Sequence, residues 1–570
     1  MNVTQPPRIE IDDEDRVAAA LASLQQARRS DLRVECVITG ERFDIEDFAI
    51  EDGGERLTLS LTAEGLPRER FDAGVRLHAS LGVEALLFSG IAVQAFRIEQ
   101  EPAALVIAKP ARVHVSNKRE STRIRLVRGM RALVQLQVYE DRNPVDARLM
   151  DLSLGGCGIE IELRAGMLLR ADQDVFALFI EFPNGTRASL PATVRHVQLA
   201  ERNGHAYVGF AFARRDDARR NGVVQWLREM EREIAFRAGH GSNHLIQPSR
   251  LFLGGTESRV SIRLDRQEHQ PPTNNTPMVA SLRRVAHVLG DTAIALRQER
   301  ALPIERLYER ADTLGRLLDE NRAEFLYALC CLPEQPPVIQ HCIAVAGRLA
   351  DLVQSEDILA SNRRDITVAA LVHDLGNVLE AGPHTASTDP LITDPAHPTN
   401  SHTGLLAALG PAASWAAGGA RRAVIERLNT PADALPEAPA SVAVDLLTRA
   451  AYVVDMIDVM SRGVGDREPK APLQIFRELY HASGEDDRRW VERYMKRHGL
   501  YPIGSLVHFS SGFLAWVLRL GDDGQPSRIR VVRDVGGQRR LNQILDRADF
   551  GQVGTIERPG LPQRFGVTPY

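Results

Sequence analysis

Two arginines and a short polar motif in the first third of the chain could together bind a flat, anionic ligand. Arg119 and Arg123 stand four residues apart at the start of a β-rich segment. Asp151, Ser153 and Gly156 follow roughly two strand lengths later. Guanidinium groups form paired hydrogen bonds with guanine O6/N7 and with phosphate oxygens. The carboxylate and the hydroxyl could bind a base edge, and the glycine would let a flat ring approach the backbone. This set predicts a guanine-nucleotide site.

The order and spacing of these motifs resemble a known receptor module. R-x-x-x-R followed by D-x-S-x-x-G is similar to the PilZ domain, which binds the bacterial second messenger cyclic di-GMP. The resemblance implies a six-stranded barrel that binds cyclic di-GMP on its outer surface through these five residues, with the arginines on a flexible connector. The alternative is a solvated basic run followed by an ordinary turn. Either motif alone would be weak, but the joint arrangement favours the nucleotide site.

Histidines and aspartates in the C-terminal half could bind a metal ion. His341 lies in one apolar helical pattern, and His373 and Asp374 are adjacent in a second. His397 follows, and Asp455 lies inside a further apolar helix. A buried histidine beside a carboxylate is costly unless something pairs them, and a divalent metal commonly does so. A lone histidine on an apolar helix is more often a satisfied core residue. The series as a whole therefore predicts the metal site.

The order H…HD…D on predicted helices resembles the HD superfamily of metal-dependent phosphohydrolases. The helix that carries Asp455 and Asp458, and the run at 501–517, further resemble the HD-GYP branch of cyclic di-GMP phosphodiesterases, whose domain ends in a small β-hairpin. Iron or manganese is the implied metal. The resemblance implies these ligands: His341, His373, Asp374 and Asp455 for one ion, and His397, or alternatively His402, for a neighbouring ion.

Departures from the HD-GYP pattern leave enzymatic activity an open alternative. Residues 424–430 read V-I-E-R-L-N-T where that branch has a histidine pair, and the G-Y-P loop is missing. Asn377 replaces the lysine that usually follows H-D-x-G. Two metals clamp the attacking and leaving oxygens together, so the loss of two imidazoles should weaken or abolish the second metal. We therefore favour a receptor with a degenerate domain over a working cyclic di-GMP phosphodiesterase.

Composition narrows the class of protein. A chain of 570 residues is too long for one core. Hydrophobic residues make up 44% and charged residues 25%, as in ordinary soluble proteins. A net charge of -5 argues against a duplex nucleic-acid binder. Five cysteines without C-x-x-C spacing predict neither a disulfide framework nor a cysteine zinc site. No apolar run approaches the ~20 residues of a membrane span, so we expect a cytoplasmic protein.

Alternating apolar residues ahead of the arginines predict a first β-domain, which resembles the N-terminal barrel of flagellar-brake (YcgR-type) proteins. That resemblance implies a flagellar-motor or other signalling partner. His498 and His508 match no motif, and we interpret them as surface residues. The predicted fold is multidomain, with two all-β barrels followed by an all-α HD domain that ends in a small β-hairpin. The expected order is a helical segment at 1–30, a YcgR-like barrel at 31–114, a PilZ domain with a C-terminal helix at 115–237, a linker at 238–278 and a degenerate HD-GYP-like domain at 279–570.

Overall fold

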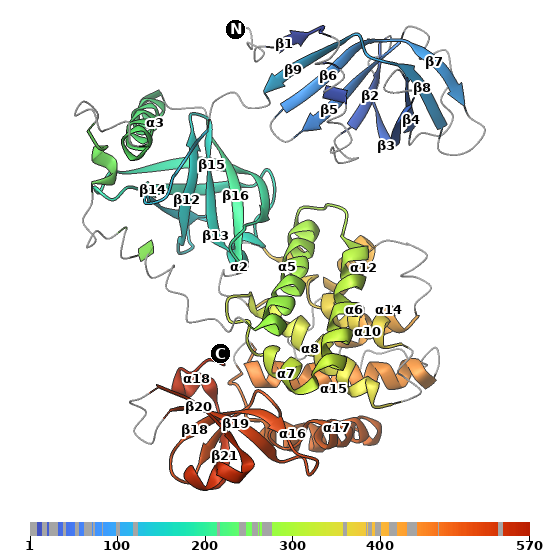
Figure 1. Ribbon diagram of the computed structural model, residues 1–570, viewed down its shortest axis with the longest axis vertical. Coiled ribbons are helices and arrows are strands. Elements are labelled where there is room, and N and C mark those ends of the chain that lie inside the picture. Colours follow the sequence, from blue (N-terminus) through green and yellow to red (C-terminus); the bar gives the residue numbers. More distant parts are fainter. Residues whose placement is uncertain are drawn as a thin grey trace. The chain divides into compact units, whose positions relative to one another are not determined.

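The chain forms two compact units, Met1–Thr122 and Arg123–Tyr570, which are drawn in Figure 1. The computed structural model describes residues 8–13, 17, 20–21, 32–37, 42–51, 56–61, 71, 74–81, 84–97, 103–117, 123–213, 217–238, 247–253, 260, 263–264, 276–356, 362–382, 385, 390–393, 401–409, 419–429, 442–464, 467–533 and 540–569.

The first unit is a nine-stranded antiparallel sheet in the order β1-β9-β6-β5-β2-β3-β4-β8-β7. Strand β3 is ten residues long and pairs with β2 through its first half and with β4 through its second. Alternate residues of β4, Leu57, Leu59 and Leu61, are at most 1% exposed. The strands are β1 (Arg8–Ile11), β2 (Leu32–Cys36), β3 (Arg42–Glu51), β4 (Arg56–Leu61), β5 (Val75–Leu81), β6 (Glu84–Ile91), β7 (Val93–Arg97), β8 (Ala103–Ala108) and β9 (Arg112–Asn117).

The β-structure expected in this part of the chain is confirmed, and one further strand lies where only helix was expected. Strand β1 lies within the segment 1–30, for which only helix was expected, and it pairs with β9 at the edge of the sheet. Its sequence R-I-E-I does alternate. Four residues are too few for periodicity to distinguish a strand from an irregular segment.

The second unit begins with a closed barrel. Strands β12, β11, β14, β15, β16 and β13 pair in that order, and β13 pairs again with β12, which closes a six-stranded ring. The short β10 adds to β12. Helix α3 packs Trp226 against Phe182, with ring centroids 5.1 Å apart. The elements are β10 (Ile124–Arg125), β11 (Leu133–Gln137), β12 (Val145–Ser153), β13 (Gly156–Glu162), α2 (Leu163–Gly166), β14 (Asp174–Glu181), β15 (Arg187–Leu199), β16 (His205–Phe212) and α3 (Asp217–Arg237).

The rest of the second unit is helical until near its end, as expected. Helix α8 packs against α10 and α15. Its residues Ile339, Ile343, Ala346 and Leu349 are all fully buried, which is the helical face that the sequence predicted. The helices are α5 (Pro277–Arg297), α6 (Ile304–Glu320), α7 (Arg322–Ala328), α8 (Pro337–Gln354), α10 (Arg363–Val372), α11 (Asn377–Glu380), α12 (Ser401–Leu409), α14 (Gly419–Asn429), α15 (Val442–Arg462), α16 (Pro472–Ala482) and α17 (Glu485–His498).

The chain ends in a sheet that is larger than the expected hairpin. The run at 501–517 does contain the antiparallel pair β17 and β18, but they lie inside a five-stranded sheet of order β20-β19-β18-β17-β21. The prediction of a small hairpin was therefore too short: Ile529 and Val531 of β19 do alternate, but β20 and β21 carry little apolar alternation. The last elements are β17 (Leu506–Phe509), β18 (Leu514–Leu520), β19 (Pro526–Arg533), β20 (Arg540–Asp546), β21 (Ile556–Gly560) and α18 (Pro562–Phe565).

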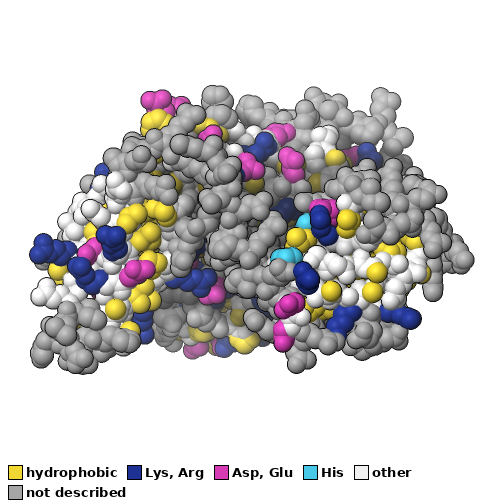
Figure 2. Space-filling model, turned by 90° about the horizontal axis from the view of Figure 1, so that it is seen from above, with side chains coloured by type: hydrophobic (Ala, Val, Ile, Leu, Met, Phe, Trp, Pro, Cys, Tyr) yellow, Lys and Arg dark blue, Asp and Glu magenta, His cyan; other side chains and the backbone are white. Residues whose placement is uncertain are grey.

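The barrel and the helices of the second unit share one hydrophobic core. At Gly290 of α5, an added Cβ would lie 3.0 Å from Leu163 Cδ2 and 3.1 Å from Leu199 Cδ2, so two barrel side chains rest on this helix. Among the described helices, none is both long and apolar enough to cross a membrane. On the face shown in Figure 2, acidic and basic side chains of described residues are interspersed rather than gathered by sign.

Candidate functional site

A hydrogen-bonded group of three side chains lies on the barrel at β12 and β16. Arg123 Nη1 donates to Asp151 Oδ1 at 3.2 Å and to the hydroxyl of Tyr207 at 3.3 Å. That hydroxyl donates to Asp151 Oδ2 at 2.5 Å. Burial, reinforced by Asp151, raises the pKa of Tyr207 above its ordinary value, so the phenol stays protonated and remains a donor. Asp151 is 4% exposed, and among the described residues its carboxyl group contacts one cation and one hydroxyl.

Glycines make this arrangement possible. A Cβ on Gly158 would lie 2.0 Å from the Tyr207 hydroxyl and 2.6 Å from Asp151 Oδ2. The three-residue group therefore needs glycine at position 158. A Cβ on Gly156 would lie 2.0 Å from Phe210 O on β16, which is a packing reason for that glycine that the sequence analysis did not consider.

Four of the five predicted nucleotide-binding residues lie in described parts of the chain. Arg123 and Asp151 are in direct contact. Ser153 and Gly156 are neighbours at the β12–β13 turn, where the serine Oγ donates to Gly156 O at 3.1 Å. Arg119 lies outside the described residues.

Sequence reasoning missed two residues of this site, Tyr207 and Gly158. The glycine is the last of the run G-G-C-G and lies in β13 just after the turn, where a glycine is a weak signal. The tyrosine sits in an ordinary alternating strand, where its ring stacks on His196 with centroids 5.7 Å apart. Nothing in its spacing from Asp151 could have identified it.

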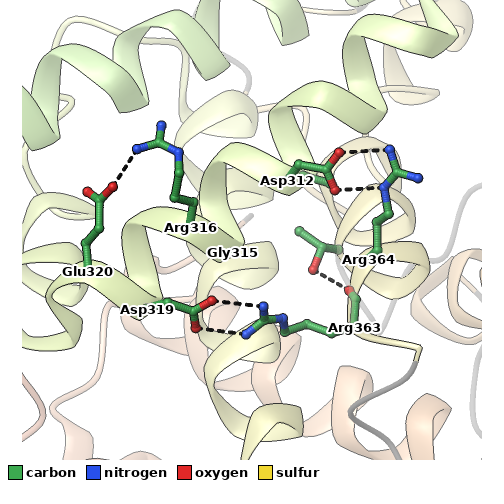
Figure 3. A pocket seen from close by; sticks show the side chains of 9 residues that line it. Asp312, Gly315, Arg316, Asp319, Glu320, Arg363 and Arg364 are labelled. Carbon is green, nitrogen blue, oxygen red and sulfur yellow. Dashed lines mark hydrogen bonds and ion pairs between the residues drawn. The ribbon is translucent and has the colours of Figure 1, made fainter.

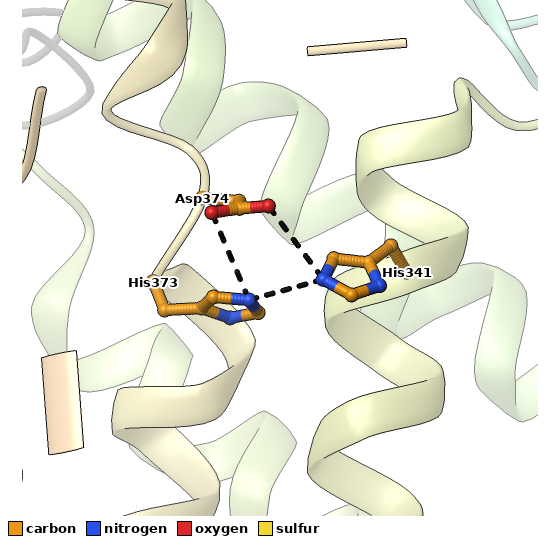
Figure 4. Close-up of side chains that lie close together, drawn as sticks. All are labelled: His341, His373 and Asp374. Carbon is orange, nitrogen blue, oxygen red and sulfur yellow. Dashed lines mark hydrogen bonds and ion pairs between the residues drawn. The ribbon is translucent and has the colours of Figure 1, made fainter. Parts of the chain in front are cut away.

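The predicted metal ligands also converge, as Figure 4 shows for three of them. His341 Nε2 lies 3.0 Å from Asp455 Oδ1, 3.2 Å from His373 Nε2 and 3.6 Å from Asp374 Oδ2. His373 Nε2 lies 3.4 Å from Asp455 Oδ1 and 3.8 Å from Asp374 Oδ1. Ligand atoms bound at about 2.1 Å to one ion are about 3.0–3.4 Å apart. The donor atoms of His341, His373, Asp374 and Asp455 come close to that spacing, and these four residues are called the donor pocket below.

The first histidine of the donor pocket has its tautomer set by a buried carboxylate. His341 Nδ1 lies 2.8 Å from Asp458 Oδ2. Burial alone would raise the pKa of Asp458, but Arg462, His341 and Arg348 outweigh it and hold that pKa well below its ordinary value. An ionised carboxylate only accepts hydrogen bonds, so Nδ1 carries a proton. In the neutral ring, Nε2 then presents its lone pair to the donor pocket.

The tautomer of the second histidine is set in the same way, by a backbone carbonyl. His373 Nδ1 lies 2.7 Å from Ala370 O, which can only accept, so Nε2 again presents a lone pair. Two lone pairs and two carboxylates, Asp374 and Asp455, thus face one another, and this arrangement needs a cation. Burial would lower the pKa of His341, but Asp455 and Asp458 raise it to about 9. The same residues that fit a metal ion would therefore hold protons in its absence.

Neutral side chains lie beside Asp374 and His373 at the edge of the donor pocket. Thr393 donates to both oxygens of Asp374, from Oγ1 at 2.5 Å and from its backbone N at 2.9 Å. Asn377 donates to Thr393 Oγ1 at 3.2 Å, and Asn429 donates to His373 O at 3.1 Å. Hydroxyl and amide groups are poorer ligands for transition metals than imidazole, so these described residues offer no strong donor for a further ion.

The remaining predicted positions near the donor pocket do not add ligands among the described residues. Val424 and Ile425, at the place of the missing histidine pair, are fully buried in the apolar core. His402 lies on α12 and is not part of the described donor group. His397 lies outside the described residues.

The interpretation of His498 as a surface residue was wrong. It is 3% exposed, stacks on Tyr494 with centroids 4.1 Å apart, and lies 3.5 Å from Asp351 Oδ2. Asp351 is fully buried and also binds Arg322 and Arg497. Burial lowers the pKa of His498 to about 3. The sequence did not reveal the burial of His498, because histidine is polar and the buried carboxylate beside it comes from a helix that is distant along the chain.

A separate hollow of about 500 Å³ lies between α6 and α10. Its guanidinium groups are each paired with a carboxylate, as Figure 3 shows. Arg363 binds Asp319 through two nitrogens, and Arg364 binds Asp312. These pairs satisfy one another, so we assign no ligand to this hollow.

Comparison with known proteins identifies the barrel. Residues 117–229 match the family model for the PilZ domain, and the chain therefore contains that domain. No curated protein matches the chain.

Solved structures also resemble part of the chain. Escherichia coli YcgR in complex with c-di-GMP is 16% identical, with 40% of this chain and 96% of that chain covered and a TM-score of 0.23. The K. pneumonia MrkH-c-di-GMP complex is 12% identical, with 41% and 99% covered and a TM-score of 0.23. The Bacillus subtilis inhibitor of motility MotI/DgrA is 12% identical, with 35% and 94% covered and a TM-score of 0.26. Likeness this weak says nothing about ligand or partner.

Proposed function

We propose that this protein is a cyclic di-GMP receptor that binds the messenger on its PilZ barrel. The observation that carries the proposal is the group formed by Arg123, Asp151 and Tyr207. The carboxylate and the hydroxyl engage only Nη1 of the arginine among the described residues. Nε and Nη2 are therefore oriented by the pair but remain available to donate to a phosphate or to a guanine edge.

The proposed site joins two parts of the PilZ motif with one residue outside the motif, Tyr207. Asp151 comes from the D-x-S-x-x-G run and Arg123 from the R-x-x-x-R run, whose first arginine, Arg119, would complete the set. A guanine nucleotide with phosphates matches both the cationic and the carboxylate components. Ser153 and Gly156 support the proposal by forming the turn that presents the carboxylate.

A second proposal concerns the helical half, which we take to be a degenerate HD-type domain with one metal site. Its support is the convergence of two histidine lone pairs with Asp374 and Asp455. The four residues are between 0% and 4% exposed. Structural metal sites are closed, whereas catalytic ones keep an open position. Bound iron or manganese would supply charge neutralisation and, in a hydrolase, activation of a water.

The two proposals together describe a receptor whose helical half relays the signal, and the alternative is a phosphodiesterase controlled by its own PilZ domain. A flagellar-motor or other signalling partner remains a prediction from the resemblance of the N-terminal β-domain. The burial of the donor pocket favours the relay, because a cyclic dinucleotide could not reach the four donors as they lie.

The test is a titration of the full chain with cyclic di-GMP, followed by chromatography of the recovered nucleotide. We expect saturable binding, little competition from GMP or GTP, and recovery of intact ligand in the presence of iron or manganese. Absence of binding, or equal binding of GTP, would refute the receptor. Metal-dependent appearance of linear dinucleotide would favour the phosphodiesterase.

A further inference from the structure

Two side chains at the C-terminal end of α5 hold the PilZ barrel, and one of them, Arg297, also holds the segment that follows the donor pocket. Arg297 is 5% exposed. Its Nε donates to Leu168 O of the barrel at 3.0 Å, and its Nη1 donates to Val378 O at 3.0 Å and to Leu379 O at 3.3 Å in α11. Burial, together with nearby Arg170, lowers the pKa of Arg297 to about 10, so it remains charged at neutral pH.

The next residue, Gln298, binds the same barrel segment through both its side-chain oxygen and its side-chain nitrogen. Gln298 Oε1 accepts from Ala171 N at 2.9 Å, and Gln298 Nε2 donates to Leu169 O at 2.8 Å. Arg170 Nη2 in turn donates to Leu379 O at 3.1 Å. We call Arg297 and Gln298 the α5 clamp. The clamp holds Leu168, Leu169 and Ala171 of the barrel on the end of α5, and Arg297 also holds α11.

Each end of this connection lies close in the chain to one of the proposed sites. The segment 168–171 follows α2, and α2 directly continues β13, whose residue Gly158 pairs with Asp151. At the other end, α11 begins at Asn377, three residues after Asp374. One strand therefore leads from the nucleotide site to the clamp, and one short turn leads from the clamp to the donor pocket.

The contact does not allow the barrel to slide freely on α5. Leu163 and Leu199 rest on Gly290, as described above. A Cβ on Gly204 would lie 2.1 Å from Glu334 O, and the Glu334 side chain is paired with Arg283 at 2.7 Å. A buried guanidinium must keep its carbonyl partners. A shift of β13 and α2 therefore has to move α11 or break these hydrogen bonds.

We propose that the α5 clamp couples the nucleotide site of the PilZ barrel to α11 and the donor pocket. The proposal rests on the proposed binding of cyclic di-GMP, but it needs no metal. Occupation of the barrel biases the position of segment 168–171, and Arg297 and Gln298 transmit that bias to α11. If the nucleotide changes the affinity of the donor pocket for a ligand by some factor, linkage requires that this ligand change the affinity for the nucleotide by the same factor.

Hydrogen exchange of the metal-free full chain, with and without cyclic di-GMP, tests the coupling. In the parent we expect the nucleotide to change exchange around residues 151–158 and also in α11, by about fivefold or more, the lower end of usual coupling between sites. In Arg297→Met the response at 151–158 should persist and the response in α11 should be reduced, because only the Arg170 bond to Leu379 O remains between the barrel segment and α11. Residues 514–533 of the terminal sheet should not respond in either protein.

Two further variants serve as a substitute and as a control. Gln298→Met removes two hydrogen bonds at a less buried position, so it serves if Arg297→Met does not fold, and it should also reduce the α11 response. Arg300→Met is the matched control, because Arg300 is exposed and has no side-chain partner among the described residues.

The outcomes distinguish failure of the coupling from failure of the receptor. A parent that binds nucleotide at 151–158 without any change in α11 overturns the coupling alone. An α11 response that is undiminished in both clamp variants also overturns it. A parent that binds no cyclic di-GMP overturns the proposed function and the coupling together.

Discussion

Replacing Arg123 with alanine tests the proposed nucleotide site most directly. The substitution removes the guanidinium that Asp151 and Tyr207 orient. A hydrogen bond to a charged group contributes about 1.5–3 kcal/mol, so we expect the Kd for cyclic di-GMP to rise by about 10- to 150-fold. Folding should also suffer, because Asp151 is 4% exposed and would keep, among the described residues, the tyrosine hydroxyl alone. We expect that loss of stability to be about 1–3 kcal/mol.

The assay is isothermal titration of the full chain at about 0.15 M salt, where the Debye length is about 8 Å and distant charges are screened. Arg128→Ala is the matched control, because Arg128 is exposed nearby and has no side-chain partner among the described residues. Arg123→Lys keeps the charge but loses the forked geometry, so it should be intermediate. A melting curve of each variant separates lost binding from lost folding.

Two results would refute the reasoning. One is an affinity of Arg123→Ala within about twofold of the parent, since even a single lost charged hydrogen bond should exceed that. The other is an equal loss in Arg128→Ala, which would show that only general positive charge matters.

Three other predictions concern the glycine, the donor pocket and the buried histidine. Gly158→Ala should weaken cyclic di-GMP binding by about tenfold or more without unfolding the barrel, because its Cβ would lie 2.0 Å from the Tyr207 hydroxyl; unchanged titration would contradict this. Asp374→Ala should lower the content of iron or manganese measured by mass spectrometry, whereas Asp312→Ala, which removes a surface carboxylate, should not; equal content in Asp374→Ala and the parent would refute the site. The pKa of His498 is about 3 in the folded chain and about 6.5 when unfolded, so the unfolded state binds the extra proton as pH falls. This histidine should therefore make the protein about 2 kcal/mol less stable at pH 5 than at pH 7; if melting curves of His498→Gln show the same pH dependence as the parent, the assignment is wrong.

The sequence by itself determined the parts of this protein that depend on local periodicity. Alternation identified strands such as β4, and apolar residues three and four apart identified the buried face of α8. The two arginine and aspartate motifs predicted the PilZ domain that the family comparison confirms. These features could be predicted because the side chains that define them lie within a few residues of one another along the chain.

Only the tertiary structure decided which distant residues meet. Tyr207 reaches Asp151 across 56 positions because β13 pairs with both β12 and β16 and closes the barrel. His498 is buried because Asp351 lies beneath it, and Thr393 covers Asp374 from a segment without a motif. Such contacts depend on strand register and helix packing. Neither is encoded in the spacing of residues along the chain, so no pattern could have revealed them.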